Sequence, residues 1–168
     1  SNLLRQLNLI YFADLIRFRI QKFKNKKANA QFKKEHPNVA LPPDYLMYES
    51  FQMNYNRYYN GGLNVAKNLS GYFKKHIELK DKNILDWGCG PGRIIRHMPS
   101  VINNGCHFFA TDYNKNSIDW CSKHLPNIQF NKNELDAKLP YEDNSMDVIY
   151  GISIFTHLSE QMHYKWFS

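Results

Sequence analysis

Apolar residues along this chain form short runs and helical stripes that alternate as in an α/β domain. Four runs of apolar and β-prone residues predict strands, at residues 83–86, 107–111, 127–130 and 146–155. Apolar positions at helical spacing predict helices over residues 63–77, from residue 94 onward and over residues 114–124. Strands that alternate with helices predict a parallel sheet. The fourth run is apolar on both faces, which is typical of a buried parallel strand.

The first 36 residues predict a separate helical extension. Two apolar stripes run along it at helical spacing, one of Leu4, Leu7, Tyr11, Leu15 and Phe18 and the other of Leu9, Phe12, Ile16, Ile20 and Phe23. Nine Lys and Arg residues against two acidic ones give this segment the chain's whole net charge of +7, because the other 132 residues carry thirteen of each sign. Three interactions are possible for the apolar faces of this helix. They are packing on the domain or a partner chain, peripheral contact with an anionic membrane surface, and contact with nucleic acid, which is the weakest of the three.

Residues 37–82 predict a linker, a tyrosine-rich segment and a helix. Prolines at 37, 42 and 43 favour an extended chain. Residues 45–60 are rich in tyrosine, and an amphipathic helix follows Gly61 and Gly62. Tyr55, Tyr58 and Tyr59 lie in this segment, and tyrosines on a helix more often pack half-buried than not.

The most informative motif lies at residues 83–93. A predicted strand that ends at Asp86 runs into glycines at 88, 90 and 92, and apolar residues at helical spacing come next. Glycine is needed where the main chain takes a positive φ or touches a ligand. This context favours a cofactor-binding loop over a chance glycine-rich turn. The motif resembles motif I of class I S-adenosylmethionine-dependent methyltransferases. A nicotinamide-dependent Rossmann enzyme is the weaker alternative, because its fingerprint spaces the glycines differently.

The resemblance implies a set of cofactor-binding residues at the carboxyl ends of the predicted strands. Asp86 would help to hold the methionine ammonium of S-adenosylmethionine, Asp112 the ribose hydroxyls and Tyr113 the adenine. Asp112 alone is explained equally well as the N-cap of the helix over 114–124. The complete implied set is Asp86, Gly88, Cys89, Gly90, Gly92, Asp112, Tyr113, Asp136, Ala137 and Ser153.

Two further positions of that set come after the third predicted strand. Asp136 would accept a hydrogen bond from the adenine amino group, and the main chain near Ala137 would meet the ring edge. An ordinary solvated loop aspartate is the alternative for Asp136. Cys89 occupies a variable position of the glycine loop and is expected to fill space rather than act as a nucleophile.

The segment after the fourth predicted strand narrows the choice of methyl acceptor. Residues 155–159 resemble the corresponding segment of small-molecule and glycan-associated methyltransferases, and the Leu-Pro-Pro segment agrees with that subgroup. The Asn/Asp-Pro-Pro-Tyr signature of amino-group methylation on nucleic-acid bases is not present there. The implied acceptor is a small molecule, sugar or glycolipid precursor. His157 is the candidate base, with a histidine that hydrogen-bonds a loop as the alternative.

Composition agrees with a cytoplasmic enzyme, which the basic helix could place at a membrane surface. The 168 residues fit one domain. The three cysteines and seven histidines show no metal-ligand spacing, so no metal is expected and the thiols are expected to stay reduced. No apolar run is long enough to cross a bilayer.

The resemblance implies a Rossmann-like, doubly wound parallel sheet, of which this chain would supply about four strands in the order 3-2-1-4. The resembling family has seven strands. The resemblance covers residues 41–168 and only the cofactor-binding half, with residues 83–168 as the binding part proper. In such enzymes the segment before motif I often forms a lid over cofactor and acceptor, which makes Tyr55, Tyr58 and Tyr59 lid candidates here. A fourth strand at the sheet edge predicts a possible homo-oligomer through it. A non-catalytic domain that keeps this fold for binding or assembly is the alternative to an enzyme.

Overall fold

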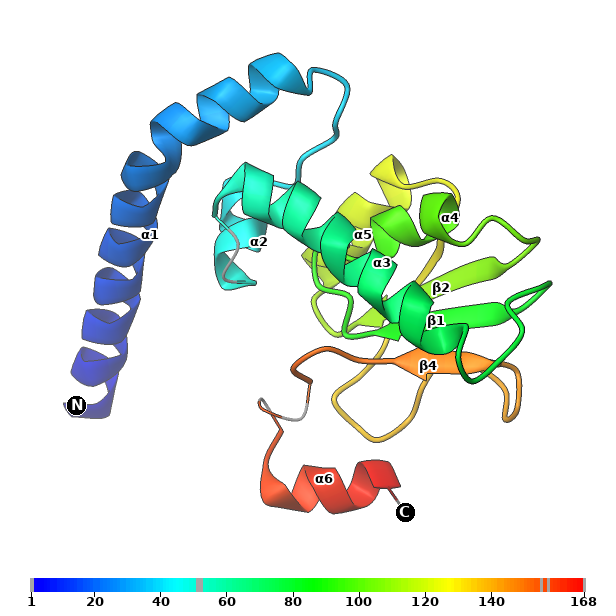
Figure 1. Cartoon of the computed structure of the whole chain (residues 1–168). Coiled ribbons are helices and arrows are strands. Elements are labelled where there is room, and N and C mark those ends of the chain that lie inside the picture. The colour runs from blue at the N-terminus through cyan, green and yellow to red at the C-terminus, as the bar shows by residue number, and fades with distance from the viewer. Residues whose placement is uncertain (1, 51–52, 155, 157, 168) are drawn as a thin grey trace. The chain divides into compact units, whose positions relative to one another are not determined.

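The computed structural model describes residues 2–50, 53–154, 156 and 158–167, with side chains for residues 11–50, 53–154, 156 and 158–166. The chain divides into two compact units, Ser1–Tyr59 and Asn60–Ser168. Figure 1 labels most of their helices and strands.

The first unit is helical. It contains α1 (Asn2–Glu35) and α2 (Asp44–Glu49), and a π-helical turn, Arg57–Gly61, begins near its end. The long N-terminal helix expected from the apolar stripes is confirmed. Residues 36–43 hold no helix or strand, as the prolines in this stretch predict.

Aromatic side chains from separate segments form the core of this unit. Phe32 of α1, Met47 of α2, Tyr55 and Tyr58 are buried together. The main-chain N–H of Tyr55 donates to the buried Asn29 side chain at 3.0 Å, so that this polar group is satisfied. Tyr55 and Tyr58 therefore have the packing role that the sequence left open, and their lid role stays a prediction.

The second unit contains a four-stranded parallel sheet. Its strands are β1 (Asn83–Trp87), β2 (His107–Asp112), β3 (Gln129–Lys132) and β4 (Val148–Tyr150). They lie in the order β3-β2-β1-β4, and all three neighbouring pairs are parallel. The expected Rossmann-like fold with strand order 3-2-1-4 is confirmed.

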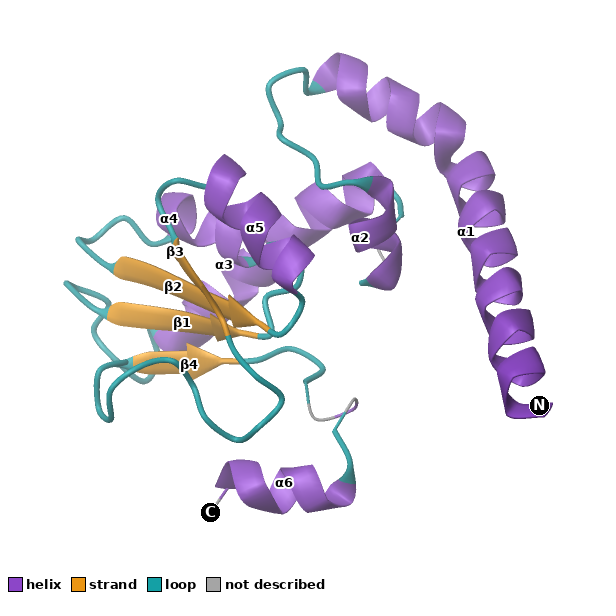
Figure 2. Cartoon of the chain, turned by 180° about the vertical axis from the view of Figure 1, so that it is seen from behind, coloured by secondary structure: helices purple, strands orange, loops and turns teal. Residues whose placement is uncertain are grey.

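Helices cover the two faces of this sheet unequally. Its helices are α3 (Gly62–Phe73), the 3-10 turn Ile95–His97, α4 (Met98–Val101), α5 (Lys115–His124) and α6 (Glu160–Phe167). Figure 2 shows α3, α4 and α5 on one side of the sheet and α6 on the other. Ile84, Phe108 and Ala110 belong to the buried core shared with the first three helices. The other face is covered in part by α6, where the rings of Trp87 and Trp166 lie 4.4 Å apart.

Three elements are shorter than their apolar patterns predict. The helix expected over residues 63–77 ends at Phe73. Of the run expected to be a strand over 146–155, the described residues 146–154 form a strand only over Val148–Tyr150, and Ile149 is 52% exposed. Phe155 lies outside the described residues. Among the described residues β1 is the only strand paired with β4, so one edge of β4 stays open and one face is partly solvated. Residues 94–98 form a 3-10 turn and the start of the short α4, because Pro99 occupies the first turn of that helix.

Candidate cofactor site at the carboxyl ends of the strands

The loop after β1 is held in place by the end of β2. Gly88, Gly90 and Gly92 have φ of +73°, +52° and +77°, a conformation that only glycine adopts without strain. The main-chain N–H groups of Gly88 and Cys89 donate to the Thr111 carbonyl at 2.8 and 2.9 Å. Two strands therefore fix the path of the glycine loop.

The glycines of this loop meet different surroundings. A Cβ atom added at Gly92 would lie 3.0 Å from both Cys121 Sγ and Leu125 Cδ1, so glycine is needed there for close packing on α5. A Cβ atom added at Gly90 would meet nothing within 4 Å. The main chain at Gly90 thus borders open space, where a ligand can lie directly against it.

Asp112 joins the end of β2 to the glycine loop. Its side chain is 7% exposed, and its two oxygens accept hydrogen bonds from the main-chain N–H groups of Gly90 at 2.7 Å and Asn114 at 2.8 Å. Burial raises the pKa of Asp112, and these backbone donors oppose the increase. Each oxygen still has a lone pair that can accept from a hydroxyl group.

The N-cap of α5 is Asn114 and not Asp112. The Asn114 side chain accepts from the main-chain N–H groups of Asn116 at 3.0 Å and Ser117 at 3.3 Å. The capping role that the sequence left open for Asp112 is therefore filled by its neighbour. Tyr113, between them, is 61% exposed, so one face of its ring is free to stack.

Asp86 is a buried carboxyl group in the last part of β1. It is 3% exposed, and its register partner on β4 is Tyr150. Burial raises the pKa of Asp86 to about 7, with a further increase from the charge of Asp112, while the Tyr150 hydroxyl and Arg93 oppose it. The Tyr150 hydroxyl lies close enough to favour the carboxylate but makes no hydrogen bond of ordinary geometry with a described atom. A nearby cation would offset much of the free-energy cost of ionising this buried carboxyl group.

The chain that leaves β4 returns to the glycine loop. The side chain of Ile154 lies where a Cβ atom at Gly88 would be, so the two segments are in close contact. Ser153 has a φ of +63°, which is uncommon for a residue other than glycine, and its carbonyl accepts from Thr156 Oγ1 at 2.7 Å. The structure therefore brings Ser153 to the same end of the sheet as Gly88.

The remaining predicted residues are less closely tied to this cluster. Asp136 is exposed and Ala137 is half-buried, in the loop after β3. The start of that loop is bound to β2, because the Asn133 main-chain N–H donates to the Asp112 carbonyl at 3.2 Å. His157, the candidate base, lies outside the described residues.

The cysteines near the loop are poor candidates for a nucleophile. Burial raises the pKa of Cys89 well above its ordinary value and that of Cys121 to about 12, so both stay protonated and are poor nucleophiles at neutral pH. Within the part of the chain that the structure describes, no group of three or more His, Cys, Asp or Glu side chains could hold a metal ion.

Residues 84–168, half of the chain, match the protein family described as methyltransferase domain. The chain belongs to this family. The expected class of protein is thereby confirmed, and with it S-adenosylmethionine as the cofactor of a methyltransferase domain. The match does not extend to the glycan-biosynthesis subgroup.

The chain is similar to several solved structures. A protein from Methanococcus maripaludis, assigned to the S-adenosylmethionine-dependent methyltransferases, matches with a TM-score of 0.50 and 17% identity over 84% of this chain and 58% of its own. A TehB-like methyltransferase from Corynebacterium glutamicum matches at 0.43 and 19% identity, over 64% and 63% of the two chains. One from Aquifex aeolicus matches at 0.44 and 23%, over 57% and 56%. The chain spans less than two thirds of the length of each.

The residues of this methyltransferase domain fit the cofactor. A buried carboxyl group with a pKa of about 7 suits a cationic ammonium partner, and the loop leaves open space beside Gly90. Asp112 retains lone pairs for the two hydroxyls of a ribose. The exposed ring of Tyr113 offers a flat surface to a base.

Sequence reasoning missed two residues of the site. Tyr150 lies beside Asp86, and Ile154 contacts Gly88. Strand register could have revealed Tyr150, because parallel neighbours in register point to the same face. The contact of Ile154 depends on a backbone turn at Ser153 with positive φ, for which the sequence holds no signal.

The raised pKa of Asp86 predicts a pH-dependent stability of the methyltransferase domain. Between the ordinary value of 3.8 and about 7, the folded protein binds more protons than the unfolded chain. Its free energy of unfolding should therefore fall as the pH rises through this range, by roughly a few kcal/mol, and level off above it. Denaturant unfolding at pH 5 and pH 8 measures the difference. Asp86→Asn should reduce it, and an unchanged pH dependence in that variant contradicts the assignment.

Proposed function

We propose that this chain is the cofactor-binding portion of an enzyme that transfers a methyl group from S-adenosylmethionine to an acceptor. The observation that carries the proposal is the arrangement around the glycine loop. Thr111 and Asp112 hold the loop from β2, and Ile154 contacts it from the segment after β4. Asp86 lies buried at the end of β1, the strand that leads into the loop. Ligands of open α/β sheets bind at this end of the strands.

Each residue of the site has a role that its chemistry supports. Asp86 pairs with the methionine ammonium, which favours its ionised form. Asp112 accepts hydrogen bonds from the ribose hydroxyls while it keeps the loop bound through Gly90. Tyr113 lies along the adenine ring. Asp136 accepts a hydrogen bond from the adenine amino group, and the main chain of Ala137 contacts the edge of the adenine. Gly88, Cys89, Gly90, Gly92 and Ser153 form the wall of the site.

The bound cofactor supplies a methyl group that its sulfonium makes electrophilic. The protein has to align an acceptor lone pair with that group and exclude water. We assign His157 as the base that removes a proton from a hydroxyl acceptor. His157→Ala should lower the turnover of a hydroxyl acceptor about a hundredfold or more, whereas His107→Ala, at the amino end of β2, should not.

The acceptor is proposed to be a small molecule, a sugar or a glycolipid precursor. Residues 37–168 carry no net charge and so have no overall attraction for a polyanion such as nucleic acid. The segment after β4 also lacks the Pro-Pro-Tyr sequence of enzymes that methylate base amino groups. The open edge of β4 is a proposed contact between two copies of the chain.

Calorimetric titration of the chain with S-adenosylmethionine, S-adenosylhomocysteine and NAD tests the proposed cofactor. We expect the first two to bind and NAD not to bind. Binding of NAD alone would favour a nicotinamide-dependent enzyme. Tight binding of S-adenosylhomocysteine by the full-length protein, without product formation on a panel of small-molecule and sugar acceptors, would favour a non-catalytic binding domain.

A further inference from the structure

Helix α1 packs on the rest of the first unit through one face. Phe18 meets the rings of Tyr45 and Tyr48 of α2 edge-on, with centroids 5.5 and 5.4 Å apart. Tyr48 donates a hydrogen bond to the Asp14 carboxylate at 2.7 Å. Further along, the buried Phe32 lies on the same side of the helix. The helix thus already has a buried face within its own unit.

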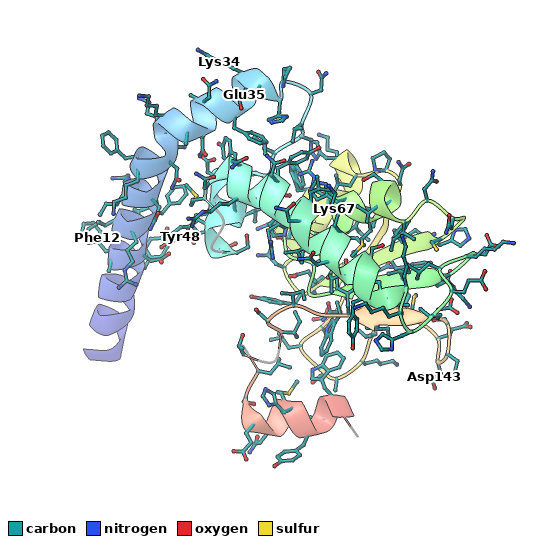
Figure 3. All side chains as sticks on the ribbon, in the orientation of Figure 1. Phe12, Lys34, Glu35, Tyr48, Lys67 and Asp143 are labelled. Carbon is teal, nitrogen blue, oxygen red and sulfur yellow. The ribbon has the colours of Figure 1, made fainter. Side chains whose placement is uncertain are left out.

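A second apolar face lies on the opposite side of α1. Phe12, Ile16, Ile20 and Phe23 fall within an arc of about 80° on a helix of 3.6 residues per turn, facing away from the packed side. They are 60%, 42%, 47% and 79% exposed, respectively. Figure 3 shows Phe12 and Tyr48 on opposite sides of the helix. Four large apolar side chains in one exposed row indicate an interaction surface.

Basic side chains border this apolar row. Arg19 and Lys24 flank it, and Lys26 and Lys27 come after it along the helix. All four are exposed, and none makes an ion pair with a described residue. The lysine on the packed side differs, because Lys22 pairs with Asp44 at 2.8 Å. Positive charge that the unit itself does not use therefore surrounds the apolar face.

We propose that this face of α1 binds an anionic lipid surface. Apolar side chains in a row with Lys and Arg beside them match the interface of a membrane, where the former enter the acyl boundary and the latter meet acidic headgroups. The segment of residues 1–36 carries all of the chain's net charge of +7, which is complementary to such a surface. No described helix is long and apolar enough to cross a membrane, so contact through α1 would be interfacial. The proposal is independent of the proposed function.

Sedimentation with lipid vesicles tests this surface. We expect the chain to bind vesicles of phosphatidylcholine with about one third phosphatidylglycerol, and to bind pure phosphatidylcholine at least tenfold more weakly. Phe12→Gln with Phe23→Gln should lower partitioning into the anionic vesicles at least tenfold. Lys26→Glu with Lys27→Glu should lower partitioning to a similar extent. The difference between this variant and the wild type should become smaller at high salt.

Matched controls separate this surface from general effects of charge and apolar exposure. Tyr72→Gln with Tyr164→Gln removes two aromatic rings of similar exposure, 61% and 71%, from the second unit. Lys74→Glu with Lys75→Glu makes the same change of charge at two exposed lysines after α3. Both control pairs should keep at least half of the wild-type binding.

Three results would overturn the proposal. The first is an absence of binding to anionic vesicles, and the second is equal loss of binding in the control pairs. The third is evidence that something other than lipid occupies this face. Such evidence would be dimerisation in light scattering that Phe12→Gln with Phe23→Gln abolishes, or binding to an oligonucleotide without binding to vesicles. Circular dichroism of each variant checks that α1 is still helical.

Discussion

Replacing Gly62 with alanine is expected to destabilise the methyltransferase domain strongly. The effect should be larger than that of the same replacement at any other glycine of α3. A Cβ atom at Gly62 would overlap the carbonyl oxygen of Arg93, which is main chain and cannot rotate away. Arg93 directly follows the glycine loop, so that α3 and the loop must separate to admit the methyl group. We expect a loss of about 2–3 kcal/mol or more in the free energy of unfolding, measured by urea denaturation.

The neighbouring glycine offers a matched control. Gly61 has helical dihedral angles, φ −62° and ψ −40°, and a Cβ atom there would meet nothing within 4 Å. Gly61→Ala should therefore be neutral or stabilise by up to about 1 kcal/mol. Equal stability of the two variants would show that α3 does not pack on the loop in this way. Gly62→Ala should also weaken cofactor binding, because the displaced segment adjoins Gly92.

Replacing Asp112 with alanine is expected to weaken the binding of S-adenosylhomocysteine about 10- to 150-fold. The change removes the acceptor proposed for the ribose hydroxyls and the carboxylate that binds Gly90 N–H at 2.7 Å. Charge-assisted hydrogen bonds of this kind contribute roughly 1.5–3 kcal/mol, which corresponds to that loss of affinity. Isothermal titration calorimetry measures it directly.

A second aspartate separates binding from stability. Asp147 also accepts from a main-chain N–H, that of Asn83 at 2.9 Å, and pairs with Lys82, but it lies at the amino ends of β1 and β4. Asp147→Ala should lower stability and leave the affinity for S-adenosylhomocysteine within about twofold. If both variants bind with wild-type affinity, Asp112 does not contact the cofactor and the proposed ribose site is wrong.

Much of the sheet was predictable because its signals are local. The strands β1 and β2 have the predicted boundaries to within one residue, because each is a short apolar run that ends at a polar or glycine-containing turn. The same holds for α5, where Asn114 begins a helix with apolar positions at regular spacing. Strand β3 is shifted by two residues, to Gln129–Lys132, because its polar outer positions give a weak pattern.

The sequence by itself determined the succession of strands and helices along the chain, the glycine loop after β1 and the acidic residues at the ends of β1 and β2. Those features depend on neighbours in the chain and on backbone preferences of single residues. Tertiary structure alone decided that Tyr150 lies beside Asp86 and that Gly62 meets Arg93. It also decided which side of α1 packs on the rest of its unit. Both stripes have helical spacing, and only the packing of Phe18 and Phe32 within the first unit leaves the row from Phe12 to Phe23 exposed.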